Sequence, residues 1–188
     1  NWYMSIWYWN VPTPFDYPDL RCRPYYLSDV MMVKELMRIN LVYASTSGNV
    51  EVVIETVARV LRQNGFEIML SRAEKTPIDT IKKNKYFVFG TSTWEHGLLN
   101  PFFQKLYDAM QTENFPNKQA AFIGLGDRRY EPVLFCEGIE QVHEIWLKKG
   151  GKDVGTMLKI QGEPYENLDS LVAPWAYELA QLWKSHRA

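Results

Sequence analysis

A hydroxyl-rich turn follows the apolar run 41–44 and leads into a helical pattern. Its residues are Ser45, Thr46, Ser47, Gly48, Asn49 and Val50. Hydroxyls and the free N–H groups at the start of a helix bind anions, and a glycine permits close approach of the backbone. The turn itself contains no Lys or Arg. The sequence therefore predicts a phosphate site that is built from neutral donors.

Two later loops contain aromatic side chains that could bind a flat ring. Trp94 lies in the segment 91–100 and Tyr130 lies in the segment 125–135. Two aromatic side chains on either side of a crevice could stack on a ring, each contributing about 1 kcal/mol beyond the area it buries. The alternative is that each is an ordinary core or surface aromatic. Their position in loops beside glycines favours ring binding.

These three loops follow three of the five strands that the sequence predicts. We expect strands at 39–44, 66–70, 86–90, 120–125 and 154–160. Apolar residues at helical spacing predict helices at 50–61, 78–83, 102–110, 139–146 and 168–183. Thr76 should cap the second helix with Pro77 at its first position, and Pro174 should delay or kink the last.

Alternating strands and helices predict an α/β fold, with a parallel sheet that helices cover on both faces. In such sheets ligands bind beyond the carboxyl ends of the strands. The segments 91–101 and 126–135 are expected to be loops at these ends, together with the turn at 45–50. A phosphate turn and two aromatic loops should therefore converge on one site.

Composition narrows the class of protein. The chain has 188 residues, 46% of them hydrophobic, and a net charge of -1. These values predict one main domain and argue against a general nucleic-acid or anionic-membrane binder. Cys22 and Cys136 lack metal-ligand spacing, and the three histidines are far apart, so we expect no metal site, reduced thiols and a cytoplasmic setting.

Residues 1–36 differ from the rest of the chain. They contain nine aromatic residues and four prolines but no glycine. The prolines exclude a continuous helix. One interpretation is a disordered or non-native extension, and the other is an aromatic arm that packs on the domain or on a partner. The folded domain is expected to span residues 37–188.

The chain from Met37 to Trp183 resembles the flavodoxins, and among them the short-chain type. The turn at 45–50 is similar to the family's phosphate loop except at Val50. The segment 92–94, Ser-Thr-Trp, resembles the loop that covers the inner face of the flavin. The segment 124–136 resembles the loop whose tyrosine stacks on the outer face. The strand at 154–160 is expected to run unbroken into 162–164, without the insertion of long-chain members.

The resemblance implies a flavodoxin-like sheet of strand order 2-1-3-4-5 and noncovalent binding of FMN. It assigns the phosphate to the turn at 45–50. It assigns the ring and the ribityl chain to Ser92, Thr93, Trp94, Glu95, Leu125, Gly126, Asp127, Tyr130, Phe135 and Cys136. The implied function is low-potential transfer of single electrons between a reductase and an acceptor protein. The protein is expected to be a monomer that has no catalytic residues and binds neither nucleic acid nor a membrane.

Three positions depart from the family pattern. Val50 replaces the usual Thr and removes a hydroxyl contact to the phosphate, a net effect of about 1 kcal/mol. Glu95 replaces a common Gly, which allows the local peptide to turn over easily, so a less favourable first one-electron reduction is expected. Arg128 and Arg129 lie beside the predicted ring, either as local steering charges or as solvated loop charges.

Two other functions are compatible with these residues. The first is an FMN-dependent quinone or protoporphyrinogen oxidoreductase on the same fold. Such an enzyme needs room for a substrate beside the ring, and the loop at 126–135 offers little. The second is a binding module without flavin, which Val50 and the N-terminal extension would permit.

Overall fold

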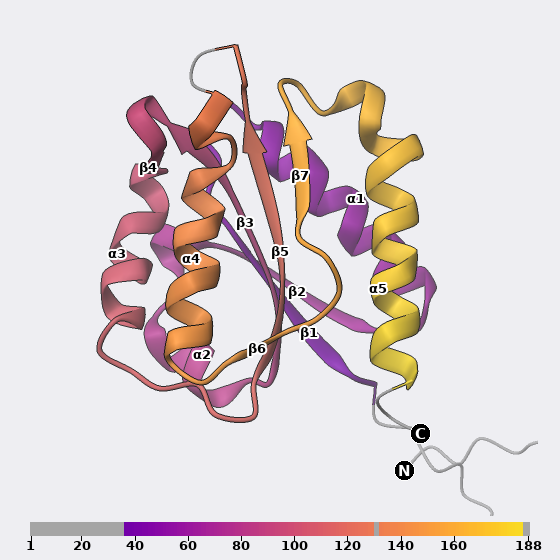
Figure 1. The fold of residues 1–188 in the computed structure, drawn as a ribbon. Coiled ribbons are helices and arrows are strands. Elements are labelled where there is room, and N and C mark those ends of the chain that lie inside the picture. The colour runs from indigo at the N-terminus through magenta and orange to yellow at the C-terminus, as the bar shows by residue number, and fades with distance from the viewer. Residues whose placement is uncertain (1–35, 130–131, 186–188) are drawn as a thin grey trace, which may run out of the picture. The chain divides into compact units, whose positions relative to one another are not determined.

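The computed structural model describes residues 36–129 and 132–185. A parallel sheet forms its centre, with helices on both sides (Figure 1). The main strands are β1 (Arg38–Tyr43), β2 (Glu67–Arg72), β3 (Tyr86–Trp94), β5 (Gln119–Gly126), β6 (Lys152–Asp153) and β7 (Leu158–Gln161). A two-residue strand, β4 (Leu98–Leu99), pairs antiparallel with the end of β3.

The order of the strands across the sheet is β2-β1-β3-β5-β6, with β7 also beside β5. All of these pairs are parallel. Since β5 is the fourth predicted strand and β6 with β7 makes up the fifth, the expected order 2-1-3-4-5 is confirmed. The turn after β1 and the loops after β3 and β5 therefore meet at one edge of the sheet.

The helices are α1 (Asn49–Gln63), α2 (Ile78–Lys83), α3 (Pro101–Met110), α4 (Glu137–Lys148) and α5 (Ala173–Ser185). Helices α1 and α5 bury apolar side chains against one face of the sheet, and α3 and α4 cover the other (Figure 1). Pro174 is the second residue of α5, and a π-helical turn (Leu168–Val172) comes directly before the helix. The expected late start of the last helix is confirmed.

Apolar side chains of the strands fill two hydrophobic cores, one on each face of the sheet. In β3, Phe87 and Phe89 face α3 and α4, whereas Val88 faces α1 and α5. In β5, Ile123 faces α1 and α5, whereas Phe122 faces α3 and α4. Successive strand residues point to opposite faces, so an apolar run of this kind belongs to a strand that is covered on both sides.

Three local expectations were wrong. Strand β3 extends to Trp94 instead of ending at residue 90, because Thr91 and Ser92 still pair with β5 and the last two residues pair with β4. The last strand is interrupted at 154–157, where Gly155 has φ 71°. Thr76 does not cap α2, since its hydroxyl donates to Arg72 O at 2.8 Å and Pro77 occupies the cap position.

The expectation for the N-terminal extension lies outside the described residues, apart from Leu36. Within the described ranges, none of the helices is long and apolar enough to cross a membrane.

Candidate cofactor site

The hydroxyl-rich turn lies between the carboxyl end of β1 and the first turn of α1. Gly48 precedes the helix with a left-handed backbone, φ 89°, which a glycine adopts without strain. Its N–H donates to Ser45 Oγ at 3.0 Å and closes the turn. The first three N–H groups of α1, those of residues 49–51, have no earlier helical carbonyl to bond, since the first helical bond runs from Val52 N to Gly48 O at 3.1 Å. This end of the helix can therefore donate to an anion.

Asn100 joins the turn to the loop after β3. Its side chain is fully buried at the N-cap of α3. Its Nδ2 donates to Thr46 Oγ1 at 3.1 Å and to Ser92 Oγ at 3.0 Å, and its Oδ1 accepts from Phe102 N at 3.0 Å. One amide thus fixes the relative position of two walls of the site.

Helix α4 holds the loop after β3 from the other side. Gly138 N donates to Thr93 Oγ1 at 3.0 Å, and Gln141 Nε2 donates to Gly97 O at 2.8 Å. Between these anchors His96 has a left-handed backbone, φ 55°. Trp94, which precedes it, is 41% exposed. The loop therefore presents a large aromatic surface on a backbone that is held at both ends.

Asp127 organises the loop after β5. It accepts from Arg129 through the backbone N–H and through a guanidinium ion pair at 2.6 Å, and Gln161 Nε2 donates to it at 2.9 Å. The hydrogen bonds from Arg129 hold the pKa of the Asp127 carboxyl well below its usual range. Arg128 lies with its guanidinium carbon 4.3 Å from the centre of the Phe135 ring.

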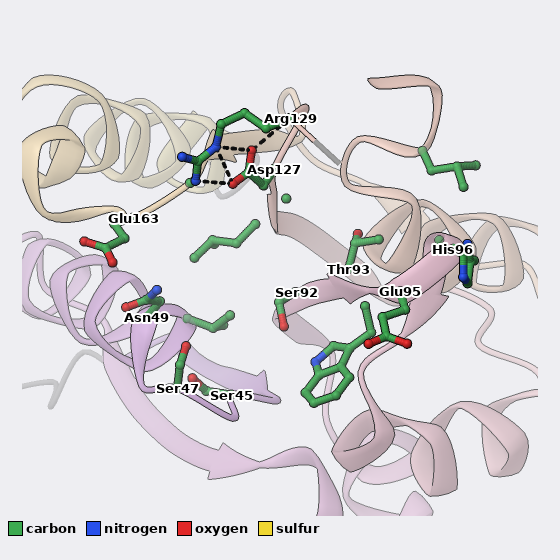
Figure 2. A pocket seen from close by; sticks show the side chains of 17 residues that line it. Ser45, Ser47, Asn49, Ser92, Thr93, Glu95, His96, Asp127, Arg129 and Glu163 are labelled. Atoms are coloured by element: carbon green, nitrogen blue, oxygen red, sulfur yellow. Dashed lines mark hydrogen bonds and ion pairs between the residues drawn. The ribbon is translucent and has the colours of Figure 1, made fainter. Parts of the chain in front are cut away.

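A cavity of about 760 Å³ opens between these segments (Figure 2). The turn after β1 and Asn49 lie on one side of it, the loop with Glu95 and His96 on another, and Asp127 with Arg129 on a third. The residues that line it are Ser45, Ser47, Asn49, Val50, Ser92, Thr93, Trp94, Glu95, His96, Gly97, Leu125, Gly126, Asp127, Arg129, Leu134, Gly162 and Glu163.

The flavodoxin family model matches residues 41–175, which include every segment around the cavity. The chain belongs to the flavodoxin family.

Known flavodoxins are similar to it in sequence and in fold. The flavodoxin of Nitratidesulfovibrio vulgaris is 30% identical over 144 residues, which are 75% of this chain and 95% of that protein. A short-chain flavodoxin associated with a non-canonical PDU bacterial microcompartment has a TM-score of 0.71 and 23% identity, over 80% of this chain and 99% of its own. The Fusobacterium nucleatum flavodoxin bound to flavin mononucleotide has a TM-score of 0.63 and 17% identity, over 80% and 99%.

The flavodoxin-type loops contribute most of the predicted site residues to the cavity wall. Eleven of the sixteen line it: Ser45, Ser47, Asn49, Val50, Ser92, Thr93, Trp94, Glu95, Leu125, Gly126 and Asp127. Four others are not among the residues that line it: Thr46, Gly48, Phe135 and Cys136. Tyr130, the predicted outer aromatic, lies outside the described residues.

Gly162 and Glu163 line the cavity although the sequence analysis did not assign them to the site. They follow the carboxyl end of β7, so the rule that ligands bind beyond strand ends could have identified them. Arg72 was also missed, although the end of β2 places it beside the turn: its Nη2 donates to Ser45 O at 2.6 Å. The guanidinium of Arg72 therefore holds the phosphate turn, which itself contains no cationic side chain.

In residues 36–129 and 132–185, no group of three or more His, Cys, Asp or Glu side chains is arranged to hold a metal ion. The absence of a bound metal stays a prediction.

Proposed function

We propose that this cavity binds FMN noncovalently and that the protein passes single electrons at low potential between redox protein partners. One observation supports this most strongly. A single cavity joins an anion-binding turn at the start of α1 to an exposed tryptophan at the end of β3. A phosphate with a flat ring beyond it is the ligand that such a cavity suits.

The size and donors of the cavity suit FMN. Its volume of about 760 Å³ lies within the usual range for small-ligand sites, about 300–1,000 Å³. Hydroxyls and helix N–H groups at one end are neutral donors for a phosphate, and Trp94 offers a face for a ring. The isoalloxazine ring of FMN accepts and releases the electrons, and the protein binds and orients it.

The charges around the cavity favour a low reduction potential. Among the described residues that line it, the carboxylates are those of Glu95, Asp127 and Glu163, and the one guanidinium is that of Arg129. Arg129 is already paired with Asp127. Negative charge that reduction adds to a bound flavin is therefore disfavoured, which lowers its reduction potential. The physical reason is the one that raises the pKa of an acid beside carboxylates.

The visible spectrum of the purified protein tests FMN binding. We expect the absorption of an oxidised flavin, and release on denaturation of one FMN per chain. Stepwise reduction should bleach it at potentials well below that of free FMN. Purified protein that stays colourless after incubation with excess FMN would overturn the proposal and favour the flavin-free module.

A turnover assay separates an electron carrier from an oxidoreductase. A carrier should not oxidise NADH or NADPH with a quinone as acceptor unless a separate reductase is added. Sustained turnover by the purified protein alone would favour the enzyme alternative. A monomer, a cytoplasmic location and the identity of the reductase and acceptor stay predictions, which sedimentation, fractionation and pull-down experiments can test.

A further inference from the structure

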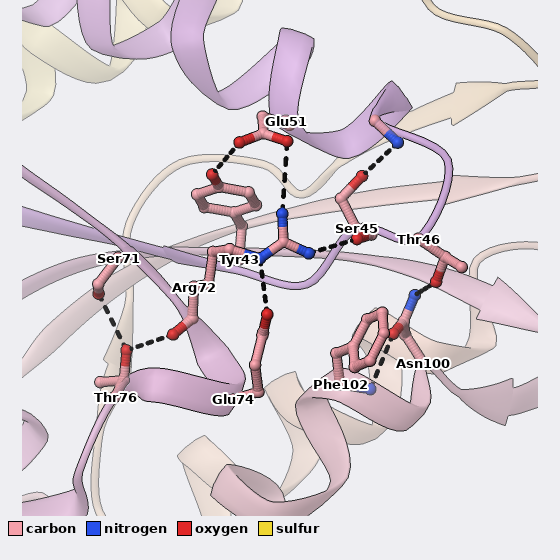
Figure 3. A network of polar contacts seen from close by, with 11 residues as sticks. Tyr43, Ser45, Thr46, Glu51, Ser71, Arg72, Glu74, Thr76, Asn100 and Phe102 are labelled. Carbon is pink, nitrogen blue, oxygen red and sulfur yellow. Dashed lines mark hydrogen bonds and ion pairs between the residues drawn. The ribbon is translucent and has the colours of Figure 1, made fainter.

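Arg72 at the end of β2 binds the phosphate turn, the first turn of α1 and the segment that follows β2. It is the last residue of β2, and strand pairing places it opposite Tyr43 of β1. Its Nη2 donates to Ser45 O at 2.6 Å, its Nε to Glu74 at 2.6 Å, and its Nη1 to Glu51 at 3.4 Å (Figure 3). The guanidinium uses both edges of its planar fork, a geometry that a lysine cannot reproduce.

Two aromatic rings enclose the same guanidinium. Its carbon lies 5.7 Å from the ring centre of Tyr43 and 6.0 Å from that of Phe102. The Tyr43 hydroxyl donates to Glu51 at 2.6 Å, and burial together with this carboxylate raises the pKa of Tyr43 to about 12. Tyr43 therefore stays neutral at physiological pH. The side chain of Arg72 is only 28% exposed, so its position is well determined by its neighbours.

The bond to Ser45 O has a geometric consequence for the turn. The C=O and N–H of one trans peptide point in opposite directions. Holding the Ser45 carbonyl on Arg72 therefore fixes the direction of the Thr46 N–H on the far side of that peptide. The closing bond of the turn, donated by Gly48 N, is accepted by the Oγ of the same Ser45. Arg72 thus sets the orientation of the first peptide of the anion-binding turn from behind.

The charges around Arg72 make this role specific for an anion. Its guanidinium lies between the carboxylates of Glu51 and Glu74. Glu51 belongs to the first turn of α1, the same helix end that faces the predicted phosphate. Without the guanidinium, both carboxylates would lose this cation, and Glu51 at the helix end would keep its negative charge and the hydrogen bond from Tyr43. A phosphate would be repelled, whereas an uncharged group in its place would not.

We propose that Arg72 is a positioning residue that holds the turn in its anion-binding form and so gives the protein its preference for a flavin with a phosphate monoester over one without. This inference rests on the proposed function, because it assumes that FMN binds in the cavity. Arg72 does not line the cavity, so it acts through Ser45 and through the charge balance.

Two variants of Arg72 test the inference with two ligands. The dissociation constants of the apoprotein for FMN and for riboflavin are measured by quenching of flavin fluorescence. In Arg72→Gln we expect the Kd for FMN to rise about tenfold or more, as for loss of a charged hydrogen bond. The Kd for riboflavin should change less than about twofold, since neutral ligands gain little from the charge balance. Arg72→Lys keeps the charge but not the fork, so it should recover part of the FMN affinity.

Arg38→Gln is the matched control. Arg38 pairs with Glu67 across the same two strands, at 3.0 Å, but at the opposite end of the sheet. Its loss should leave both dissociation constants unchanged. Circular dichroism and thermal unfolding of each apoprotein show whether the variants fold. If Arg72→Gln does not fold, the test uses Arg72→Lys instead. The ratio of its FMN affinity to its riboflavin affinity is then compared with that of the unaltered protein.

The possible results separate the inference from the proposed function. An unchanged ratio of the two affinities in the Arg72 variants, with FMN bound by the unaltered protein, overturns the role of Arg72 alone. Equal weakening of FMN and riboflavin gives Arg72 a general stabilising role and also overturns it. An unaltered protein that binds neither flavin rejects the proposed function, and the inference with it.

Discussion

The side-chain amide of Asn100 donates to the hydroxyl oxygen of Thr46 across 3.1 Å, although the two residues are 54 positions apart in the sequence. Asn100 is fully buried, whereas Thr46 is exposed. The bond joins the phosphate turn to the start of α3. Two loops that are far apart in the sequence are therefore joined directly by a side-chain hydrogen bond.

A double-mutant cycle measures this bond. Asn100→Ala should lower the free energy of unfolding by about 2–3 kcal/mol, because it removes the N-cap of α3 and the donor to the hydroxyls of Thr46 and Ser92. Thr46→Val should cost less than about 1 kcal/mol, and the coupling between them should be about 1 kcal/mol. Urea unfolding of the four apoproteins gives these values. Additive effects would show that the contact contributes nothing.

Val50→Thr should restore a hydroxyl at the cavity. We expect FMN to bind about fivefold more tightly, as for one net hydrogen bond of about 1 kcal/mol. Val50 is only 2% exposed and packs in the core, so the apoprotein should lose about 1 kcal/mol of stability. Fluorescence titration and urea unfolding measure the two effects.

Val53→Thr serves as the control for Val50→Thr. Val53 lies on the same buried face of α1 but does not line the cavity. It should show the loss of stability without the gain in affinity. A Val50→Thr protein that binds FMN no better than the unaltered one would refute the role of the missing hydroxyl.

Charge reversal at Arg128 should change electron transfer with small charged reagents. Arg129 is paired with Asp127, whereas Arg128 lies over the Phe135 ring. In stopped-flow experiments at low salt, Arg128→Glu should slow oxidation of the reduced holoprotein by ferricyanide several-fold and speed oxidation by hexaammineruthenium(III). Both effects should fade at high salt, where the Debye length falls to about 3 Å at 1 M.

Lys82→Glu makes the same charge change far from the cavity. Lys82 belongs to α2 and pairs with Glu113. If it alters the two oxidation rates as much as Arg128→Glu does, the effect reflects net charge and Arg128 has no local role.

Cys136 should be unreactive in the native protein at neutral pH. Burial raises the pKa of its thiol from 9.0 to about 11. Below about pH 9 the thiol is neutral in both the folded and the unfolded chain, so it adds no pH dependence to stability there. Between that pH and about 11 the unfolded chain ionises first, and folding stability falls as the pH rises.

Alkylation measures the reactivity of this thiol. Iodoacetamide at pH 8 should modify the peptide that contains Cys136 at least about tenfold more slowly in native protein than in urea, as mass spectrometry can follow. Equal rates under the two conditions would contradict burial of the thiol.

The sheet was predictable because its evidence is local. Apolar runs separated by helical patterns predict the strands and their parallel direction, whereas the resemblance to the flavodoxins supplied their order across the sheet. The ends of the strands were less predictable. Thr91, Ser92 and Thr93 have the composition of a loop, yet all three continue β3, because the first two pair with β5 and Thr93 pairs with β4. That pairing depends on the register, which composition does not contain.

The walls of the cavity were largely predictable, whereas their supports were not. Ser45 and Trp94 stand in recognisable motifs. Arg72 and Asn100 stand in no motif, and their roles depend on where β2 ends and α3 begins. A one-residue change in the register of β2 would direct Arg72 to the other face of the sheet. Supporting residues of this kind are visible only once the strands are placed.

The strands β6 and β7 pair with β5 separately, so the position of the cavity corner that follows β7 does not depend on the length of the chain between them. Asp153 pairs with Ala120 and Leu158 with Ile123, so the four residues 154–157 face only two residues of β5. Trp175 of α5 donates to Thr156 O at 2.8 Å and holds this bulge from outside the sheet. The chain can therefore gain or lose residues between β6 and β7 while both strands keep their pairing. Length variation at this joint is expected to leave Gly162 and Glu163 in place.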